Sequence, residues 1–387
     1  MRTFGKWLGR IFLTLVLAAL VVGLWKREEI MRLMAVNSLF AEEKIVTNFS
    51  NMDAAFLNAP VDRGNGPTTP LRYGPETALP AAVDDWIKAR NVTSLLVMKK
   101  GEILYENYFL GTQPEDRRIS WSVAKSFISA LVGILLEEGA IVSLDDPVTR
   151  YAPELQGGAY GKATLRDVLQ MESGVTFDED YLDYDSDINR MGRVIALGGE
   201  MDTFAAELTE TFAPPGDRWK YVSIDTHIVS MVVRGATGRS LADLLSEKII
   251  QPLGLEQSPY YLTDGAGTAF ALGGLNLTTR DYARFGQMFL QEGSWQGQQV
   301  VPRDWVRAST RPSARTAEGE IRYGYQWWIP QGSPDGTYMA RGIYGQYIWI
   351  DSGAGTVIVT TSADRKFREA GVNQQNIDIF RLITESL

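Results

Sequence analysis

The chain has 387 residues, of which 45% are hydrophobic and 22% charged, a composition typical of a globular protein with one large domain or two smaller ones. Its net charge of -9, without any cluster of lysine and arginine, argues against a nucleic-acid-binding protein. The absence of cysteine excludes disulfides, thiolate metal sites and cysteine nucleophiles. The single histidine, His227, excludes a two-histidine zinc site within one chain, and it would have to serve any Ser-His-Asp triad. A hydrolase of this composition is therefore expected to activate its nucleophile with a base other than imidazole.

The N-terminal residues 1–33 form a membrane anchor or a signal segment by their pattern, with basic residues ahead of an apolar run, Ile11–Trp25. As a helix this run spans about 22 Å, or about 28 Å when counted from Trp7, against a bilayer core of roughly 30 Å. No small-x-small cleavage site follows the run, so we favour an uncleaved anchor over a signal peptide. Basic residues flank both ends and hardly decide the orientation. We expect a bilayer as a partner and residues 34–387 on one side of it, in the periplasm or outside the cell.

Residues 34–84 are predicted to be a linker or an N-terminal arm, because residues 60–80 are rich in proline and glycine. A hairpin follows, with strands at Ser94–Lys99 and Glu102–Phe109. A second hairpin is predicted far along the chain, at Gln346–Asp351 and Thr356–Thr361.

Residues 120–310 are dominated by helical patterns, such as the segment that begins with the capping pair Thr278 and Asp281. The chain ends in an amphipathic helix, Asn373–Leu387. Strands at both ends with helices between them predict an α+β fold rather than a parallel doubly wound sheet. Its antiparallel sheet is built from the N- and C-terminal parts and flanked by helices, with an inserted, mostly helical region. We place this catalytic domain at residues 85–387.

The stretch "WSVAKSFISALVGILLEEG" contains a lysine, Lys125, in what is otherwise a buried helix. Desolvating an ammonium costs several kcal/mol, so such a lysine needs a partner or a function. Ser122 lies three residues earlier, on the same helical face and in the first turn, where free N–H groups favour negative charge. A partly desolvated Lys125 has a lowered pKa and can act as the base for a Ser122 nucleophile. The alternative is an amphipathic helix whose lysine reaches the surface.

About a hundred residues later, "PPGDRWKYVSIDTHIVS" supplies Tyr221 and Ser223. A phenol near Lys125 would have its pKa lowered by the cation, and it could shuttle a proton between Ser122 and a leaving group. Ser223 would hold the lysine by a hydrogen bond. Taken alone, Tyr221 has an alternative interpretation as a core tyrosine.

Together these motifs resemble the serine β-lactamase and penicillin-recognising enzyme superfamily. "SVAK" resembles its Ser-x-x-Lys motif and "YVS" its Tyr-x-Asn/Ser motif, and "ATLRDVLQMESGV", "ATGRSLADLLSEKIIQPLGL" and "ALGGLNLTTRDYARFGQMFLQEGSW" look like its connecting segments. The resemblance covers residues 85–387 in the family's order. "FDEDYLDYDSD" and "RGIYGQYIWID" look most like the branch of 6-aminohexanoate-dimer hydrolases and esterases.

The resemblance implies a β-lactamase-like fold and an acyl-enzyme on Ser122, with Lys125 and Tyr221 as the acid/base pair. It also implies an oxyanion hole formed by the backbone N–H groups of Ser122 and Ile343. The family's Lys-Thr-Gly or His-x-Gly motif is replaced here by "ARG", residues 340–342, so the usual cation for a β-lactam carboxylate is missing. As a neighbouring strand residue, Arg341 is expected to point to the other face.

Three further residues are expected to bind substrate. Tyr181 is carried over from the resemblance, Gly342 belongs to the third motif, and Trp327 is chosen from "YGYQWW", where one of two adjacent tryptophans faces the pocket. The acidic run Asp178–Asp187 begins like a calcium loop but lacks the turn glycine and the final glutamate, so no metal is expected. His227 is interpreted as a packed, hydrogen-bonded histidine.

The hypothesis is a serine hydrolase that cleaves a small ester or amide without metal or organic cofactor. No G-x-S-x-G or P-loop motif supports an α/β-hydrolase or a nucleotide-binding enzyme. Two alternatives stay open: a D-Ala-D-Ala carboxypeptidase or β-lactamase, and a catalytically inactive, membrane-tethered binding module.

Overall fold

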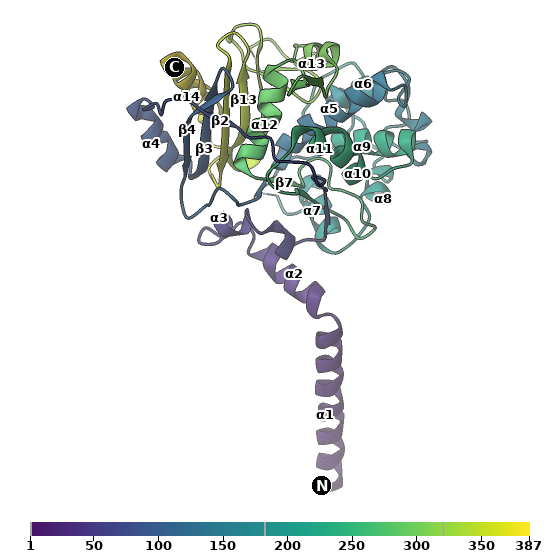
Figure 1. Cartoon of the computed structure of the whole chain (residues 1–387). Helices are drawn as coiled ribbons and strands as arrows, with labels where there is room; N and C mark the ends of the chain where they lie inside the picture. The colour runs from purple at the N-terminus through teal and green to yellow at the C-terminus, as the bar shows by residue number, and fades with distance from the viewer. Residues whose placement is uncertain (1, 182, 320) are drawn as a thin grey trace.

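The computed structural model describes residues 2–181, 183–319 and 321–387. An eight-stranded sheet at the centre of the body is assembled from both ends of the chain (Figure 1). Its strand order is β10-β11-β12-β13-β14-β3-β4-β2, and all neighbours are antiparallel except β2 and β4. The strands are β2 (Arg72–Tyr73), β3 (Val92–Lys99), β4 (Glu102–Tyr108), β10 (Arg322–Tyr323), β11 (Trp328–Ile329), β12 (Thr337–Gly342), β13 (Gln346–Asp351) and β14 (Thr356–Ser362). The predicted α+β fold with an antiparallel sheet is confirmed.

Helices cover both faces of this sheet, which explains why its central strands β3 and β14 are buried along nearly their whole length. Side chains alternate between the faces of β3: Leu96 and Met98 join the core beneath α12 (Thr279–Leu290), whereas Leu95 and Val97 join a second core. That second core lies under the helices from the two ends of the sheet domain, α4 (Ala81–Ala89) and α14 (Val372–Ser386).

The inserted region between β4 and β10 is mostly helical, as predicted, and it contributes strands to two small sheets, one of which also includes a strand of the N-terminal arm. One sheet has the order β1-β6-β7-β5 and the other pairs β8 with β9. The strands are β1 (Asn58–Pro60), β5 (Arg118–Ile119), β6 (Tyr260–Leu262), β7 (Leu275–Leu277), β8 (Ser294–Trp295) and β9 (Gln298–Gln299). Besides α12, the helices are α5 (Ala124–Glu137), α6 (Leu165–Leu169), α7 (Asp187–Ala196), α8 (Met201–Ala206), α9 (Ile224–Thr237), α10 (Leu241–Leu245), α11 (Gln251–Leu253) and α13 (Arg303–Ser309).

Helix α5 carries the predicted Ser-x-x-Lys lysine and runs through the middle of the core. Nearly all of its side chains are buried, including those of polar residues such as Ser126 and Ser129, whose hydroxyls donate to the backbone carbonyls of Gln326 and Tyr325. Gly133 lets α13 approach, because a Cβ there would lie 2.1 Å from the Trp305 ring. This packing fixes the position and tilt of α5, and so of the residues at its N-terminal end.

The N-terminal helices project from the body (Figure 1). α1 (Arg2–Trp25) is followed by α2 (Arg27–Asn37), with a bend of 73° between the two axes. Among the residues that the structure describes, no single helix has the length and apolar character to cross a bilayer; the bent pair of α1 and α2 meets both conditions only when taken together.

The segment predicted as a linker or arm lies along the surface of the body. It includes the short helix α3 (Ile45–Asn48), and its strand β1 pairs with β6. Farther along, the Arg63 side chain donates to the backbone carbonyl of Leu255 at 2.7 Å. Residues 34–84 therefore form an ordered arm that is attached to the helical region.

Candidate active site

Ser122 lies in a 3₁₀ turn, Trp121–Val123, immediately before α5. The preceding residue, Trp121, has a φ of 42°, a left-handed conformation that is unfavourable for a bulky residue. Backbone conformations of this kind persist where the surrounding structure enforces them, and they are frequent at functional sites. Here the turn places Ser122 at the boundary of two cavities, both of which it lines.

Lys125 is buried, with only 2% of its surface exposed, so the alternative of a lysine that reaches the surface is wrong. Its Nζ donates to the backbone carbonyls of Leu272 and Ser223 at 3.1 and 3.4 Å. Burial lowers the pKa of Lys125 to about 7, although the negative charges of Glu179 and Asp225 partly oppose this effect. A neutral amine that gives its two N–H groups to these carbonyls retains a lone pair for a third direction.

Tyr221 lies beside both predicted partners. Its hydroxyl lies close to those of Ser122 and Ser223, which favour its ionised form, and the Lys125 Nζ lies 5.7 Å from the centre of its ring. The expectation that the cation lowers the pKa of Tyr221 is wrong: burial raises it, and the nearby charge of Glu179 raises it further. Tyr221 is therefore a neutral phenol over the ordinary pH range, able to donate one proton and to accept another.

Glu179, which the sequence shows only as part of an acidic run, lies in the centre of this group. It accepts hydrogen bonds from the backbone N–H of Ser223 at 2.5 Å, from the Ser223 hydroxyl at 3.1 Å and from the Tyr181 hydroxyl at 3.1 Å. Burial raises the pKa of Glu179, while these donors and Lys125 lower it. Ser223 holds Lys125 by a hydrogen bond, as expected, but through its backbone carbonyl, because its hydroxyl donates to Glu179.

The end of β12 lies against the turn that carries Ser122. A Cβ on Gly342 would lie 2.7 Å from the Ser120 carbonyl oxygen and 3.1 Å from the Ser122 nitrogen. Only glycine permits this approach, which brings the backbone that follows Gly342, at Ile343, to the nucleophile. Both Ser122 and Ile343 line the two cavities that meet here.

The two cavities differ in character. The larger, of about 420 Å³, is lined mainly by apolar side chains, and Tyr181, Ser223 and Ile343 are on its wall with Ser122. The smaller, of about 330 Å³, is more polar and is lined by Ser122, Glu179, Tyr181, Tyr221, Trp328, Arg341, Gly342, Ile343, Gly345, Tyr347, Phe367, Arg368 and Asn373.

One sequence expectation about this wall is wrong. Trp327 is fully buried among aromatic rings of α12 and β12, and it is the adjacent Trp328 that lines the smaller cavity and stacks on Tyr221 with 5.1 Å between ring centres. The two tryptophans do point to opposite faces, as predicted. The left-handed turn at Gln326 (φ 62°), between β10 and β11, sets which of the two faces the site. Arg341 points away from the face of Ala340, as expected, and this is the face on which Met339 pairs with Trp328. Its guanidinium therefore lies 4.9 Å above the Trp328 ring and lines the smaller cavity.

The remaining candidates lie outside this group. His227 is buried in α9 and shares a hydrogen bond of 2.8 Å with Asp202, as the packed-histidine interpretation predicts. No group of three or more histidine, aspartate or glutamate side chains with the placement of a metal site occurs among the described residues. In the acidic run, Ser186 caps α7 and Asp183 and Asp187 accept backbone N–H groups of the same loop.

Comparisons with known proteins agree with this architecture. The Beta-lactamase family profile matches residues 83–379, most of the chain. The chain belongs to the β-lactamase family. A 6-aminohexanoate-dimer hydrolase of Paenarthrobacter ureafaciens is 33% identical over 286 residues, which are 70% of this chain and 72% of that protein.

Solved structures share the fold. A Bacillus anthracis protein assigned as a 6-aminohexanoate-dimer hydrolase superposes with a TM-score of 0.80 and 26% identity, over 90% of this chain and 95% of that one. A family VIII carboxylesterase shares the fold at a TM-score of 0.59 and 16% identity, over 78% and 95% of the two chains. The resemblance to the superfamily and to its 6-aminohexanoate-dimer hydrolase branch is thereby confirmed, and the protein is a hydrolase of the β-lactamase fold.

Proposed function

We propose that this protein is a serine hydrolase that cleaves an ester or an amide through an acyl-enzyme on Ser122. The observation that carries the proposal is the contact between the Ser122 hydroxyl and the Tyr221 phenol beside a buried lysine, Lys125, whose pKa is about 7. Such an amine is a base near neutral pH, and Lys125 follows Ser122 by three residues, one turn along at the start of α5.

In the proposed reaction, the Ser122 oxygen forms a bond with the substrate carbonyl carbon and its proton passes to Lys125. The backbone N–H groups of Ser122 and Ile343 stabilise the oxyanion. When the bond to the alcohol or amine breaks, Tyr221 gives its proton to the leaving group and is reprotonated from Lys125. Water then attacks the acyl-enzyme with the same groups in reverse roles, and the acid is released.

The relatives favour an amide or ester over a β-lactam. The name of the Paenarthrobacter ureafaciens relative describes an oligomer of an amino acid, joined by an amide, and a carboxylesterase shares the fold. In place of the lysine or histidine of the penicillin-recognising motif, this chain has Ala340 before Arg341 and Gly342. The side chains at this end of β12 thus differ from those that bind a β-lactam carboxylate. The β12 backbone at Gly342 nevertheless lies close to the Ser122 backbone.

The test is covalent labelling of the folded protein with a fluorophosphonate, followed by digestion and location of the added mass. An adduct on Ser122 that is absent from Ser122→Ala, together with turnover of simple ester and amide substrates, supports the proposal. A folded wild-type protein without an adduct would instead favour the non-catalytic binding module. Rapid and stable acylation by penicillin would favour the carboxypeptidase or β-lactamase alternative.

We further propose that the N-terminal segment anchors the catalytic domain to a membrane and that this domain lies in the periplasm or outside the cell. The support is the set of exposed apolar side chains along α1 and α2, together with the direction in which α1 leaves the body. Retention of the full chain in the membrane fraction after alkaline carbonate washing would support anchoring. Release into the supernatant would contradict it.

A further inference from the structure

The larger cavity has an apolar wall that the chemistry at Ser122 does not require. Its lining side chains are overwhelmingly aliphatic and aromatic, and its volume of about 420 Å³ falls in the range of sites for small organic ligands, roughly 300–1,000 Å³. The apolar members are Val36, Leu39, Phe40, Met52, Phe56, Trp121, Tyr181, Tyr184, Ile188, Met191, Ile195, Leu262, Phe270, Leu272, Ile343 and Tyr344. Water in such a space is displaced favourably by an apolar ligand.

The position of Tyr221 indicates which part of the substrate fills this cavity. Ser122 and Ile343 line both cavities, but Tyr221 lines only the smaller, polar one. Tyr221 protonates the leaving group in the proposed reaction, so the alcohol or amine lies on the polar side. The acyl group then extends from Ser122 into the apolar cavity.

A glycine inside a helix keeps part of this cavity open. Gly192 lies in the middle of α7 and lines the cavity, and a Cβ at this position would meet no heavy atom within 4 Å. Glycine inside a helix costs roughly 1 kcal/mol relative to alanine, so local helix stability does not explain its presence. The empty space above Gly192 is continuous with the walls formed by Ile188 and Ile195, one turn away on either side.

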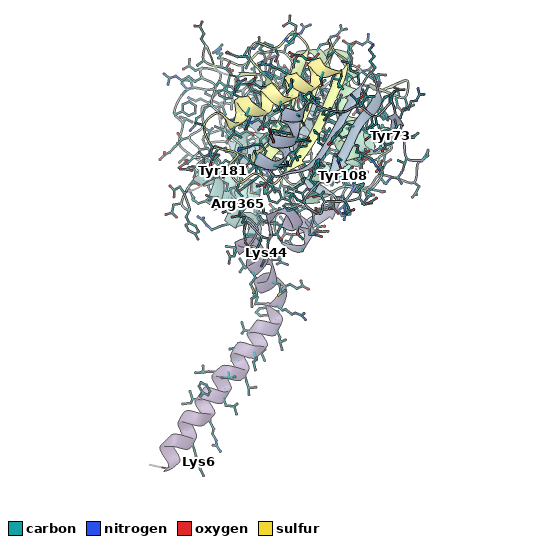
Figure 2. The ribbon with its side chains drawn as sticks, turned by 90° about the vertical axis from the view of Figure 1, so that its left-hand side faces the viewer. Lys6, Lys44, Tyr73, Tyr108, Tyr181 and Arg365 are labelled. Carbon is teal, nitrogen blue, oxygen red and sulfur yellow. The ribbon has the colours of Figure 1, made fainter. Side chains whose placement is uncertain are left out.

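The arm next to the N-terminal helices closes the cavity. Val36, at the end of α2, lines it together with Leu39 and Phe40, and the Phe40 ring stacks on Tyr344 with 5.2 Å between centres. Helices α2 and α7 lie side by side at the end of the body from which α1 leaves (Figure 1). Tyr181, which lines both cavities, lies toward the same end (Figure 2).

Helix α2 has exposed apolar side chains as well as charged ones. Met31 and Met34 are 58% and 63% exposed, and the charged residues Arg27, Glu28 and Glu29 are in its first turn. Since α2 bends by 73° from α1, an α1 that stands along the membrane normal would leave α2 nearly in the membrane plane. The apolar cavity then opens close to the lipid surface.

We propose that the apolar cavity binds the long unbranched acyl chain of a membrane-held, lipid-like ester or amide. This inference rests on the proposed function and names its substrate class. The acyl chain passes from the bilayer alongside α2, between Phe40 and α7, and places its carbonyl carbon at Ser122, while the polar leaving group lies beside Tyr221 and Arg341.

The first test compares 4-nitrophenyl esters of acetic, butanoic, octanoic and dodecanoic acids with the full chain in vesicles of ether-linked phosphatidylcholine. We expect kcat/KM to rise about threefold to fourfold per added CH₂ until the cavity is filled. Gly192→Leu should remove most of this rise, lowering the ratio of kcat/KM for the octanoyl ester to kcat/KM for the acetyl ester about tenfold or more. Gly192→Ala is the matched control and should retain the rise, since it adds a single methyl group.

The second test separates acyl chains that come from the bilayer from those dissolved in water. Met34→Glu, outside the cavity wall, should lower turnover of the vesicle-held dodecanoyl ester at least severalfold and leave that of the water-soluble butanoyl ester unchanged. Equal effects on both esters would overturn delivery from the membrane. A flat chain-length profile, or one that Gly192→Leu does not alter, would overturn the acyl cavity, whereas ester hydrolysis that persists in Ser122→Ala would instead overturn the proposed function.

Discussion

Glu179 accepts hydrogen bonds from both the backbone N–H and the hydroxyl of Ser223, at 2.5 and 3.1 Å. The backbone carbonyl of Ser223 in turn accepts a hydrogen bond from Lys125. Ser223, at the start of α9, therefore links the Glu179 carboxylate to the Lys125 side chain. Glu179 thereby fixes the position of Ser223 and adds negative charge near Lys125. Its electrostatic effect on Lys125 opposes that of burial.

Replacing Glu179 by glutamine should shift the pH dependence of activity. Because the Glu179 charge raises the pKa of Lys125, Glu179→Gln should move the rising limb of the kcat/KM profile to lower pH. The limiting kcat should stay within about tenfold of wild type, since neither proton-transferring group is removed. A full pH profile measures both effects, and a limb that stays in place or moves to higher pH would show that Glu179 has only a structural role.

Wild-type kcat/KM should rise with pH through about 7, because Lys125 must be neutral to accept the Ser122 proton. Burial raises the pKa of Asp225 to about 8 and raises that of Glu179 as well. These two carboxyl groups interact with Lys125, so the pH at which the rate rises reflects the protonation of all three groups together. The phenol of Tyr221 stays protonated throughout, because its pKa is raised. A profile that falls with pH across this range would contradict a lysine base.

Lys125→Met should abolish turnover and change how stability depends on pH. The pKa of Lys125 is lower in the folded chain than the ordinary lysine value of 10.5, so the unfolded chain binds more protons between about 7 and 10.5. The contribution of Lys125 to the free energy of unfolding therefore increases across this window and is lost as the pH falls toward 7. Urea titrations at several pH values should show a smaller rise for Lys125→Met than for wild type.

Tyr221→Phe should lower kcat by about 10²–10⁴, the usual size of one general acid–base contribution. Tyr323→Phe is the matched control: Tyr323 is fully buried, its ring centre lies 6.5 Å from that of Tyr221, and its hydroxyl has no hydrogen-bond partner among the described residues. The control should retain activity within a few-fold. Equal losses in the two variants would indicate a packing effect of the aromatic cluster and not proton transfer.

Gly342→Ala should lower kcat by about 10²–10³, comparable with the loss of an oxyanion donor, because the new Cβ would push β12 away from the Ser122 backbone. Gly66→Ala is a suitable control, since a Cβ at Gly66 meets nothing within 4 Å. Circular dichroism should show that both variants are folded. Unchanged kcat in folded Gly342→Ala would exclude the Ile343 N–H from the oxyanion hole.

The sequence by itself determined the fold class and the proximity of the proposed nucleophile and base. Both hairpins and the capped helix at Thr278 follow from local periodicity and turn chemistry, and Ser122 and Lys125 share a helix face by their spacing alone. A buried lysine is also visible in a sequence, because its apolar neighbours occur every three to four residues.

The tertiary structure decided the rest of the site, because those residues come from separate segments. Glu179 looks like any other member of an acidic loop until the loop folds over Ser223, and a left-handed turn at Gln326 decides that Trp328 rather than Trp327 faces the cavity. The sign of the Tyr221 pKa shift likewise depends on burial and on Glu179, which only the packed structure supplies. Local spacing fixes contacts within one element, whereas contacts between elements depend on the path of the whole chain.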